Sequence, residues 1–482
     1  MLTHDQKGRI GFNYIINLIQ PASQYGRETL RALRPVKKGQ AEALKKEFEN
    51  IAKTAMLFEQ NKEKYEKLEQ LFSQTKDIRK TISRIGTQLN EVDLFELKKY
   101  LLQLAEITPI FNEINEIAQY NDIGILKTEQ ALKILDPEKS NVASFHISSR
   151  SFPILAKIRE EKKEIEKKLR IATNHDEKEA LTAQRSELVK SEQKEEQKAA
   201  MWLSKKLETW RETLLQNAGV ISRLDLTMQK AKLATKYKIC VPEISGDTIS
   251  FTDMTNPQIN DILAESNRIF TPLSIELTKG STVITGANMG GKSVALKTIA
   301  LNVLLIHYGF YPFASEAKCP ILDNICLISD DLEATDRGLS SFGGEIVKLQ
   351  EILAETTNAQ SLIILDEFAR GTNPAEGREI AGAVCRYMNK QDAYTAMTTH
   401  YEGVSDHAGA HYQVAGLRKL RISDTLIQEM QSMTTKERIA KIAQYMDYGL
   451  LKVSPDEKLP EDAVNICKLL GLEQGIMELI KR

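Results

Sequence analysis

A glycine-rich segment that ends in lysine and serine could bind the phosphate groups of a nucleotide. Its residues are Gly286, Ala287, Asn288, Met289, Gly290, Gly291, Lys292 and Ser293. They fit the pattern G-x-x-x-x-G-K-S/T in full and lie between an apolar run and a run of helical character, as this pattern requires. The glycines allow backbone N–H groups to surround phosphates at the start of a helix, where the helix dipole favours negative charge. We therefore expect Lys292 to contact the β- and γ-phosphates and Ser293 to bind Mg²⁺.

Two carboxylates follow a second apolar run. This run covers residues 362–365, and Asp366 and Glu367 come directly after it. Asp366 could hold the Mg²⁺ shell, and Glu367 could polarise the water that attacks the γ-phosphate. His400 follows the strand-like run 394–399 and could donate a hydrogen bond to the γ-phosphate. The order of these groups is typical of ABC-type ATPases and predicts ATP and Mg²⁺ as cofactors.

Strands that alternate with helices must position these groups. From Tyr237 onward, the sequence contains short β-branched runs, such as 281–284 and 361–365, separated by helical segments. This alternation predicts a largely parallel sheet that is covered on both faces. The C-terminal half is therefore predicted to be an α/β P-loop domain.

The N-terminal half has the pattern of long amphipathic helices. From Gln40 to about Ile117, apolar residues recur at spacings of three and four, with few prolines or glycines. Between Phe152 and Leu215 charged residues dominate, and residues 173–176 have the composition of a turn. This pattern predicts a projecting antiparallel helical hairpin. Because its basic and acidic residues nearly balance, the hairpin could be a solvated charged helix pair or an arm that grips a ligand.

The overall composition shows local rather than global charge. The chain has 482 residues, of which 42% are hydrophobic and 27% charged, with a formal net charge of −1. This length predicts about two to four domains, and the charge excludes a globally basic nucleic-acid-binding protein. No run approaches the roughly 20 apolar residues of a membrane span, so we expect a cytoplasmic protein without membrane partners. The scattered cysteines are typical of buried, reduced thiols: Cys240, Cys319, Cys326, Cys385 and Cys467.

The residues around the candidate site resemble the MutS family. Residues 285–293 read TGANMGGKS where the family has TGPNMGGKS, and residues 366–372 resemble its DEIGRGT. Asp330 and Asp331 resemble the family's DD pair, residues 338–345 its S-T-F-x-x-E segment, and residues 399–401 its THY. The resemblance implies a P-loop ATPase domain of the ABC/MutS type that hydrolyses ATP.

The same resemblance assigns roles that the spacing alone does not. It implies that Asn288 helps to bind phosphate and that Ser340 reaches across a dimer interface to the partner's nucleotide. It therefore implies a homodimer with two composite sites. Phe270 lies two residues from the position of the family's adenine-stacking phenylalanine and is the candidate for that contact.

Outside the ATPase segment the resemblance is weaker. Residues 24–30 resemble the family's PMGRRLL and residues 77–85 its DIERxLxRI, both from the MutS core, and residues 447–449 and 463–479 loosely resemble the region that closes the ATPase dimer. The expected domains are a helical core and lever domain at 1–150, a helical hairpin with a returning lever helix at 151–235, the MutS-type P-loop ATPase domain at 236–425 and a C-terminal helical dimerisation segment at 426–482.

The sequence departs from the mismatch-reading members of the family. Those proteins carry a mismatch-reading domain and a connector domain before the core, whereas this sequence starts almost at the core. Its one F-x-E triplet, at Phe111, lies in a helical apolar run and is predicted to pack in a core. Classical mismatch reading is therefore not expected.

Two functions remain open. In the first, the ATPase is coupled to DNA binding in mismatch repair or recombination and recognises branched DNA by shape. In the second, the protein acts on another protein without binding DNA. MutS-like ATPases accompany adenosylcobalamin-dependent lysine or ornithine aminomutases as reactivating factors, and the weakly charged hairpin and near-neutral net charge favour a client enzyme of this type.

Two other residue pairs are predicted to be structural. His407 and His411 have the spacing of two metal ligands on one helical face, but Gly409 and the lack of a third ligand favour surface positions. Trp202 and Trp210 lie eight residues apart in a helical run and are predicted to pack rather than to stack on nucleic acid.

Overall fold

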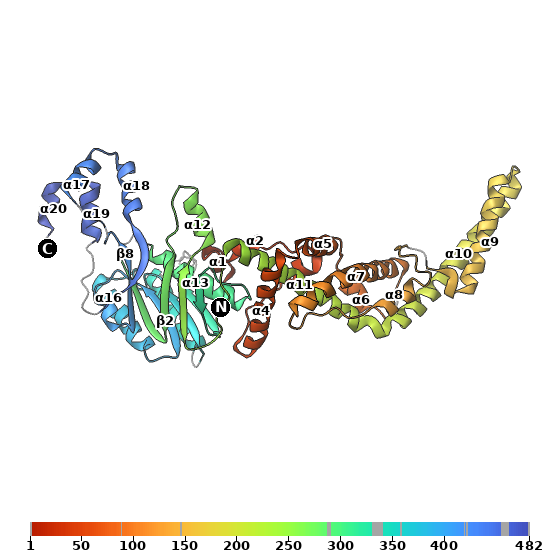
Figure 1. Cartoon of the computed structure of the whole chain (residues 1–482), viewed down its shortest axis with the longest axis horizontal. Helices are drawn as coiled ribbons and strands as arrows, with labels where there is room; N and C mark the ends of the chain where they lie inside the picture. Colours follow the sequence, from red (N-terminus) through yellow and green to blue (C-terminus); the bar gives the residue numbers. More distant parts are fainter. Residues whose placement is uncertain are drawn as a thin grey trace. The chain divides into compact units, whose positions relative to one another are not determined.

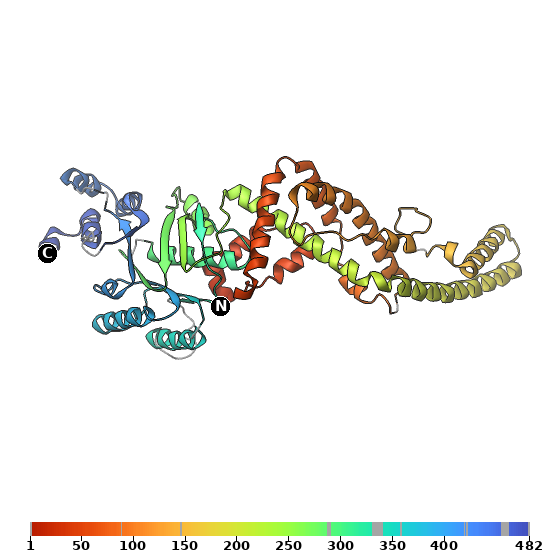
Figure 2. The ribbon, with the colours of Figure 1, turned by 60° about the horizontal axis from the view of Figure 1, so that its bottom comes forward.

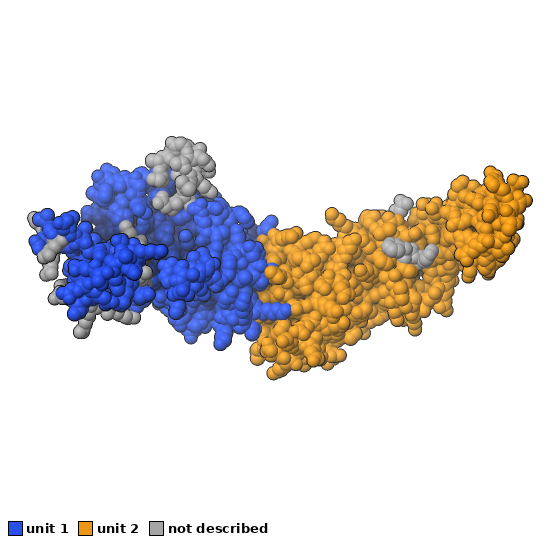
Figure 3. All heavy atoms as spheres, turned by 90° about the horizontal axis from the view of Figure 1, so that it is seen from above, with its two compact units in different colours: residues 1–19, 34–48, 232–482 blue, residues 20–33, 49–231 orange. Residues whose placement is uncertain are grey.

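The computed structural model forms two compact units, which Figure 3 shows in different colours. The described residues are 2–87, 89–144, 147–286, 291–329, 341–356, 359–418, 420, 423–454 and 462–480. Unit 1 comprises residues 1–19, 34–48 and 232–482, and unit 2 comprises residues 20–33 and 49–231.

Unit 1 is built on a six-stranded sheet (Figure 1). Its strands, in spatial order, are β5 (Asn324–Ile328), β6 (Ser361–Leu365), β7 (Ala393–Thr398), β3 (Gly280–Thr285), β8 (Ala410–Gly416) and β9 (Asp447–Lys452). The neighbours from β5 to β8 pair in parallel, and β9 pairs antiparallel with β8. Every residue of β6 and β7 is buried, so both faces of the sheet centre are covered. The predicted α/β fold with a largely parallel sheet is confirmed.

Helices and a small second sheet complete the core of unit 1. Helix α13 contacts β7, α16 contacts β3, and α15 contacts β5. Their bounds are α13 (Lys292–His307), α15 (Ser341–Thr356) and α16 (Pro374–Met388), and the 3-10 turn η4 spans Ser405–His407. The second sheet is antiparallel, in the order β2 (Leu273–Thr278), β1 (Thr248–Met254) and β4 (Glu316–Lys318), and α12 (Pro257–Ala264) follows β1.

The N-terminal segment joins unit 1 through contacts between residues far apart in the sequence. It forms α1 (His4–Arg9) and α2 (Phe12–Leu18). The side chain of Gln6, which is buried, donates a 3.1 Å hydrogen bond to the carbonyl of Leu327 in β5. Val36 N–H donates to the carbonyl of His307 at the end of α13, at 2.7 Å. Residues 1–19 and 34–48 are therefore part of the α/β unit.

The C-terminal helices of unit 1 pack around a small core of their own (Figures 1 and 2). The helices are α17 (Asp424–Gln431), α18 (Thr435–Tyr445), α19 (Asp462–Leu470) and α20 (Gln474–Leu479). The buried residues of this core are Leu417, Met430, Ile442, Met446 and Leu469. Beside this core, Ile439, Leu472, Ile476 and Leu479 are exposed apolar residues.

In unit 2, the described elements are helices. They are α3 (Gln24–Arg31), α5 (Lys62–Ser73), α6 (Arg79–Ser83), α7 (Glu91–Ala118), α8 (Glu129–Leu135), η2 (Ser149–Ser151), α9 (Pro153–Ile171), α10 (His175–Leu207) and η3 (Glu208–Trp210). The turn η1 (Lys38–Gln40) precedes α4 (Ala41–Phe58), and α4 and α11 (Arg211–Tyr237) each contain residues of both units. Phe111 is buried in the core of unit 2, which confirms its prediction as a packing residue.

Helices α9 and α10 lie side by side, as Figures 1 and 2 show in yellow and olive. Asn174 caps α10, because its side-chain oxygen accepts a hydrogen bond from Asp176 N–H. Arg159 of α9 pairs with Glu192 and Glu196 of α10, at 3.0 and 2.6 Å. Trp210 packs against the core of unit 2 as predicted, whereas Trp202 is 47% exposed and meets Phe152 edge-on.

No described helix combines the length and the apolar character that crossing a membrane requires.

Candidate nucleotide site

The chemistry-bearing residues of the sequence lie at one edge of the sheet. Gly286 follows β3, Asp366 follows β6, and His400 comes shortly after β7. These three strands are adjacent and parallel, so their carboxyl ends meet at the same edge. Ligands of open α/β sheets bind at this edge. The fold therefore brings the carboxyl ends of these three strands to one edge of the sheet.

Two glycines of the glycine-rich segment have backbone conformations that favour glycine. Gly286 has a φ of +140°, and Gly291, which precedes α13, has a φ of +85°. A Cβ atom at Gly291 would lie 3.1 Å from the ring of Tyr448, and one at Gly286 would lie 3.1 Å from the side chain of Val414. Residues 287–290 lie outside the described residues, and so do the predicted contacts of Ala287, Asn288, Met289 and Gly290.

Lys292 is the first residue of α13 and is only 3% exposed. Its Nζ donates a 2.9 Å hydrogen bond to the carbonyl of Gly286 and lies 3.5 Å from Glu367 Oε1. Burial lowers the pKa of the Lys292 ammonium, and the charges of Glu367 and Asp366 oppose this effect. A buried ammonium group at the start of a helix can donate charge-assisted hydrogen bonds to a polyanion such as a triphosphate.

Asp366 is held by two hydroxyl groups. Ser293 Oγ and Thr398 Oγ1 both donate hydrogen bonds to Asp366 Oδ1, at 3.0 and 2.7 Å. The hydroxyl of Ser293 and the carboxylate of Asp366 are oxygen donors of the kind that Mg²⁺ prefers. Their separation fits a metal ion that would be bound by both, as the sequence predicts. Thr398 was not singled out in the sequence, because a threonine in a buried strand has the pattern of an ordinary β-branched residue.

Glu367 begins a strained turn. Its φ is +47° and that of Ala369 is +65°, a region that residues other than glycine rarely adopt. The Glu367 carboxylate accepts a 2.9 Å hydrogen bond from Arg370, and Glu367 N–H donates to Thr398 Oγ1 at 2.8 Å. Backbone strain of this kind persists only where neighbouring groups hold it, and it concentrates at functional sites.

Two further residues fix the far end of this turn. Glu345 of α15 accepts a 2.8 Å hydrogen bond from Ala369 N–H through Oε2. The hydroxyl of Tyr401 donates to the carbonyl of Ala369 at 2.9 Å. Glu345 and Tyr401 both belong to the segments that resemble the family motifs, and both bind the backbone of Ala369.

A cavity of about 460 Å³ lies beside the start of α13. Its lining includes Leu263, Phe270, Gly291, Val294, Met446 and Tyr448. This volume is within the range of pockets that hold small organic ligands, about 300–1,000 Å³. The cavity therefore adjoins the end of the glycine-rich segment at Gly291.

Residues 282–470 include most of β3 and all of β6 and β7, the strands that carry this site. They match the family model described as MutS domain V. This segment of the chain is similar to domain V of the MutS family. The matched segment contains Lys292, Ser293, Asp366 and Glu367, the charged and hydroxyl groups of this site.

Individual MutS-family relatives match parts of the chain. The DNA mismatch repair protein MutS of Fusobacterium nucleatum subsp. nucleatum is 34% identical over 200 residues, which cover 40% of this chain and 22% of the relative. The endonuclease MutS2 of Enterococcus faecalis is 29% identical over 282 residues, 58% of this chain and 32% of the relative. The DNA mismatch repair protein MutS of Haloquadratum walsbyi is 31% identical over 270 residues, which cover 55% of this chain and 27% of the relative. Each match spans less than a third of the relative's length.

Three further residues that the sequence predicts for the site are Phe270, His400 and Ser340. Phe270, the candidate for adenine stacking, is 6% exposed and lines the 460 Å³ cavity. His400 is exposed, and its ring centroid lies 4.3 Å from that of Tyr401. Ser340, the residue expected to act across the dimer, lies outside the described residues. Tyr448 also lines this cavity. The sequence does not predict this contribution, because Tyr448 lies far from Phe270 along the chain.

The two histidines considered as metal ligands are separate in the structure. His407 is exposed, as predicted, whereas His411 is partly buried in β8. His411 Nε2 lies 2.8 Å from Thr285 Oγ1, and burial lowers the pKa of its imidazole. His411 is therefore only partly exposed, because β8 pairs with β3 at this residue.

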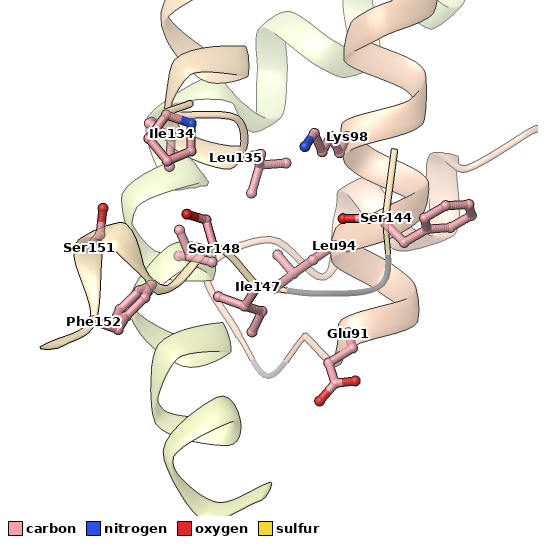
Figure 4. Close-up of a pocket in the computed structure, with 13 residues that line it drawn as sticks. Glu91, Leu94, Lys98, Ile134, Leu135, Ser144, Ile147, Ser148, Ser151 and Phe152 are labelled. Atoms are coloured by element: carbon pink, nitrogen blue, oxygen red, sulfur yellow. The ribbon is translucent and has the colours of Figure 1, made fainter. Parts of the chain in front are cut away.

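Figure 4 shows a hollow in unit 2 that is far smaller than the cavity beside α13. Its volume is about 30 Å³, and a cavity needs roughly 10–15 Å³ to hold one water molecule. Glu91 and Lys98 of α7 line it together with Ser148 and Phe152 from the segment around η2. This hollow is too small for a nucleotide.

Proposed function

We propose that the chain binds ATP with Mg²⁺ at the edge of its six-stranded sheet and hydrolyses it. The observation that carries the proposal is the convergence of Lys292, Ser293, Asp366 and Glu367. Lys292 Nζ lies 3.5 Å from Glu367 Oε1, and Ser293 Oγ donates to Asp366 Oδ1 at 3.0 Å. A cation, a hydroxyl and two carboxylates thus share one small volume.

In this proposal each group has one task. Lys292 binds the β- and γ-phosphates, and Ser293 and Asp366 hold Mg²⁺, which neutralises charge on the phosphates. Glu367 accepts a proton from water as the water oxygen bonds to the γ-phosphorus. The bond from that phosphorus to the β–γ bridging oxygen breaks, and ADP leaves with the electron pair. His400 donates a hydrogen bond to the γ-phosphate.

The neighbouring cavity provides the base site. Phe270 and Tyr448 supply aromatic surface, and Val294 belongs to the first turn of the helix that follows the glycine-rich segment. A cavity of about 460 Å³ with this lining suits a purine. Phe270 is therefore our candidate for the contact with adenine.

The active form is proposed to be a homodimer. The family resemblance assigns Ser340 to the nucleotide of the partner subunit, which makes each site composite. Exposed apolar side chains of the C-terminal segment, among them Leu472, Ile476 and Leu479, support a second copy as their partner. ATP binding would then draw the two subunits together, and hydrolysis would release them.

DNA is the proposed target of the ATPase. The relatives reported above are a mismatch repair protein in two cases and an endonuclease in the third, which supports DNA over an aminomutase client. The helix pair α9–α10 carries exposed cations near its turn, including Lys163, Lys168 and Arg170. These side chains could contact phosphates of branched DNA, so recognition by shape is expected rather than base reading.

Fluorescence anisotropy with linear, mismatched and four-way-junction DNA tests this part of the proposal. Tight binding to one DNA structure, sensitive to ATP and persistent at about 0.15 M salt, is expected, because purely phosphate-driven binding fades steeply with salt. Replacing Lys163, Lys168 and Arg170 with glutamate should weaken this binding and leave ATP hydrolysis without DNA unchanged. If the protein hydrolyses ATP but binds none of these DNA molecules, the proposed ATP hydrolysis stands and DNA is excluded as its target.

A further inference from the structure

Thr398 occupies a position where one side chain reaches both acidic residues of the site. It is the last residue of β7 and is fully buried. Its hydroxyl donates a 2.7 Å hydrogen bond to Asp366 Oδ1 and accepts a 2.8 Å hydrogen bond from Glu367 N–H. We propose that Thr398 is a positioning residue that aligns the Mg²⁺-binding carboxylate and the catalytic glutamate. This inference rests on the proposed ATP hydrolysis.

The chemistry of a hydroxyl group makes this double role specific. A threonine hydroxyl has one hydrogen to donate and two lone pairs to accept. Its hydrogen goes to the carboxylate of Asp366, and a lone pair receives the backbone N–H of Glu367. Together with Ser293, it places two hydrogen bonds on the same oxygen of Asp366. The rotation of this carboxylate is thereby fixed, so its second oxygen also has a defined direction.

The contact with Glu367 stabilises a backbone conformation that is unfavourable by itself. Glu367 has a φ of +47°, in the left-handed region. The hydrogen bond from its N–H to Thr398 ties this residue to β7, which lies in the middle of the sheet. Side chains on rigid, buried strands hold catalytic groups more closely than side chains on loops do.

The other end of the turn is held independently of Thr398. Ala369 is bound on its N–H by Glu345 and on its carbonyl by Tyr401. Loss of the Thr398 hydroxyl should therefore leave the turn in place but allow Asp366 and Glu367 to change direction. A small displacement of a catalytic group can cost about 100-fold in rate. We expect hydrolysis to suffer and nucleotide binding to persist, since Lys292 and the base cavity do not depend on Thr398.

Thr395 provides a matched control on the same strand. It is also fully buried in β7, three residues before Thr398. Among the described residues, its hydroxyl has no hydrogen-bond partner. Replacement by valine, which is close in shape, removes the hydroxyl at either position. The two variants therefore differ in whether the lost hydroxyl touched the acidic residues.

The experiment compares the full-length wild type with Thr398→Val, Thr398→Ser and Thr395→Val. Steady-state ATP hydrolysis is measured over a Mg²⁺ series, and binding of a fluorescent ATP analogue is measured separately. Thr398→Val should lower kcat by about 10-fold to 100-fold and raise the Mg²⁺ concentration for half-maximal activity, with the dissociation constant of the analogue changed by less than about threefold. Thr398→Ser should recover most of the activity, and Thr395→Val should behave like the wild type.

Other outcomes overturn the proposal in distinguishable ways. Wild-type values of kcat and Mg²⁺ dependence for Thr398→Val would show that the hydroxyl positions nothing. An equal loss in Thr395→Val would mean that any buried threonine of β7 matters, and failure of Thr398→Ser to recover activity would exclude the hydroxyl as the cause. A wild type that hydrolyses no ATP would instead refute the proposed function, and this inference with it.

Discussion

The candidate site depends on a few side chains whose charges compensate one another. Lys292 is buried beside Glu367, and Arg370 pairs with the second oxygen of the same carboxylate. A buried ion pair requires compensation on both sides, because removal of one partner leaves the other charge unpaired. The phosphates of ATP would compete with Glu367 for Lys292. Nucleotide binding would thus free the Glu367 carboxylate from Lys292, so that it could contact the attacking water.

Separate substitutions of these residues should separate binding from hydrolysis. Lys292→Ala removes the cation for the phosphates and should weaken nucleotide binding. Glu367→Ala should keep nucleotide binding but slow turnover by about 100-fold or more, the scale of lost general-base catalysis. Fluorescent-nucleotide titration and steady-state phosphate release measure the two effects. An unchanged rate in purified Glu367→Ala would eliminate Glu367 as the base.

The sequence predicts the residues that would contact the nucleotide and Mg²⁺, but not the residues that hold them in place. Gly286, Lys292 and Asp366 could be found because each follows or begins a recognisable element, and parallel strands bring their ends together. Thr398 could not, because only the structure shows that its hydroxyl faces Asp366. Long-range packing likewise determines that Tyr448 joins Phe270 in one cavity. Local patterns carry no information on such pairs.

At the scale of elements, the start of α7 and the helix pair α9–α10 form a cluster of charges. Glu91 is the first residue of α7, and Glu192 and Glu196 lie on α10. Arg159 of α9 pairs with both glutamates of α10. The sequence predicts these helices from their periodicity. It does not predict that one arginine would serve two carboxylates while a third carboxylate lies nearby.

This cluster should make the stability of the protein depend on pH. Burial, together with a hydrogen bond and the negative charge of Glu196, raises the pKa of Glu91 to about 6, and the charge of Arg159 opposes the shift. A carboxyl whose pKa is higher in the folded state stabilises the fold when protonated. Its contribution is therefore complete below its ordinary pKa of 4.5 and is lost as the pH rises through about 6.

Glu91→Gln removes this titration. The variant should be more stable than the wild type at pH 7 to 8. This range lies about one to two units above the pKa of Glu91, so the wild-type carboxyl is ionised there and its favourable protonated form is lost. The advantage should shrink as the pH falls toward the ordinary range of a glutamate. Thermal unfolding of both proteins across this range measures it, and other titrating groups cancel in the difference. A constant difference at all pH values would contradict the assignment.

At the scale of the whole molecule, two units are connected by continuous helices. Helices α4 and α11 each contain residues of both units, and unit 1 also takes in residues 1–19 and 34–48. The periodicity of the sequence predicts these helices, but it cannot assign their ends to separate cores. That assignment follows from contacts such as Tyr311 OH to the carbonyl of Phe48, at 2.7 Å, which join residues far apart in the sequence.

The last prediction concerns the assembly of two chains. If Ser340 completes the partner's site, a subunit with Ser340→Ala and a subunit with Lys292→Ala should complement each other. Their heterodimer has one site with an intact Lys292 from the first subunit and an intact Ser340 from the second, while its other site lacks both. Random mixing of two-fold symmetric dimers should then restore about a quarter of the wild-type sites.

The measurement is ATP hydrolysis of the mixture compared with each variant alone, after co-purification through two different tags has confirmed heterodimers. Activity above the sum of the separate variants is expected. A control mixture of two differently tagged Lys292→Ala preparations should stay inactive, because neither of its sites has the phosphate-binding cation. Confirmed heterodimers without recovered activity would mean that Ser340 does not act across the interface, and that each subunit hydrolyses ATP with its own residues.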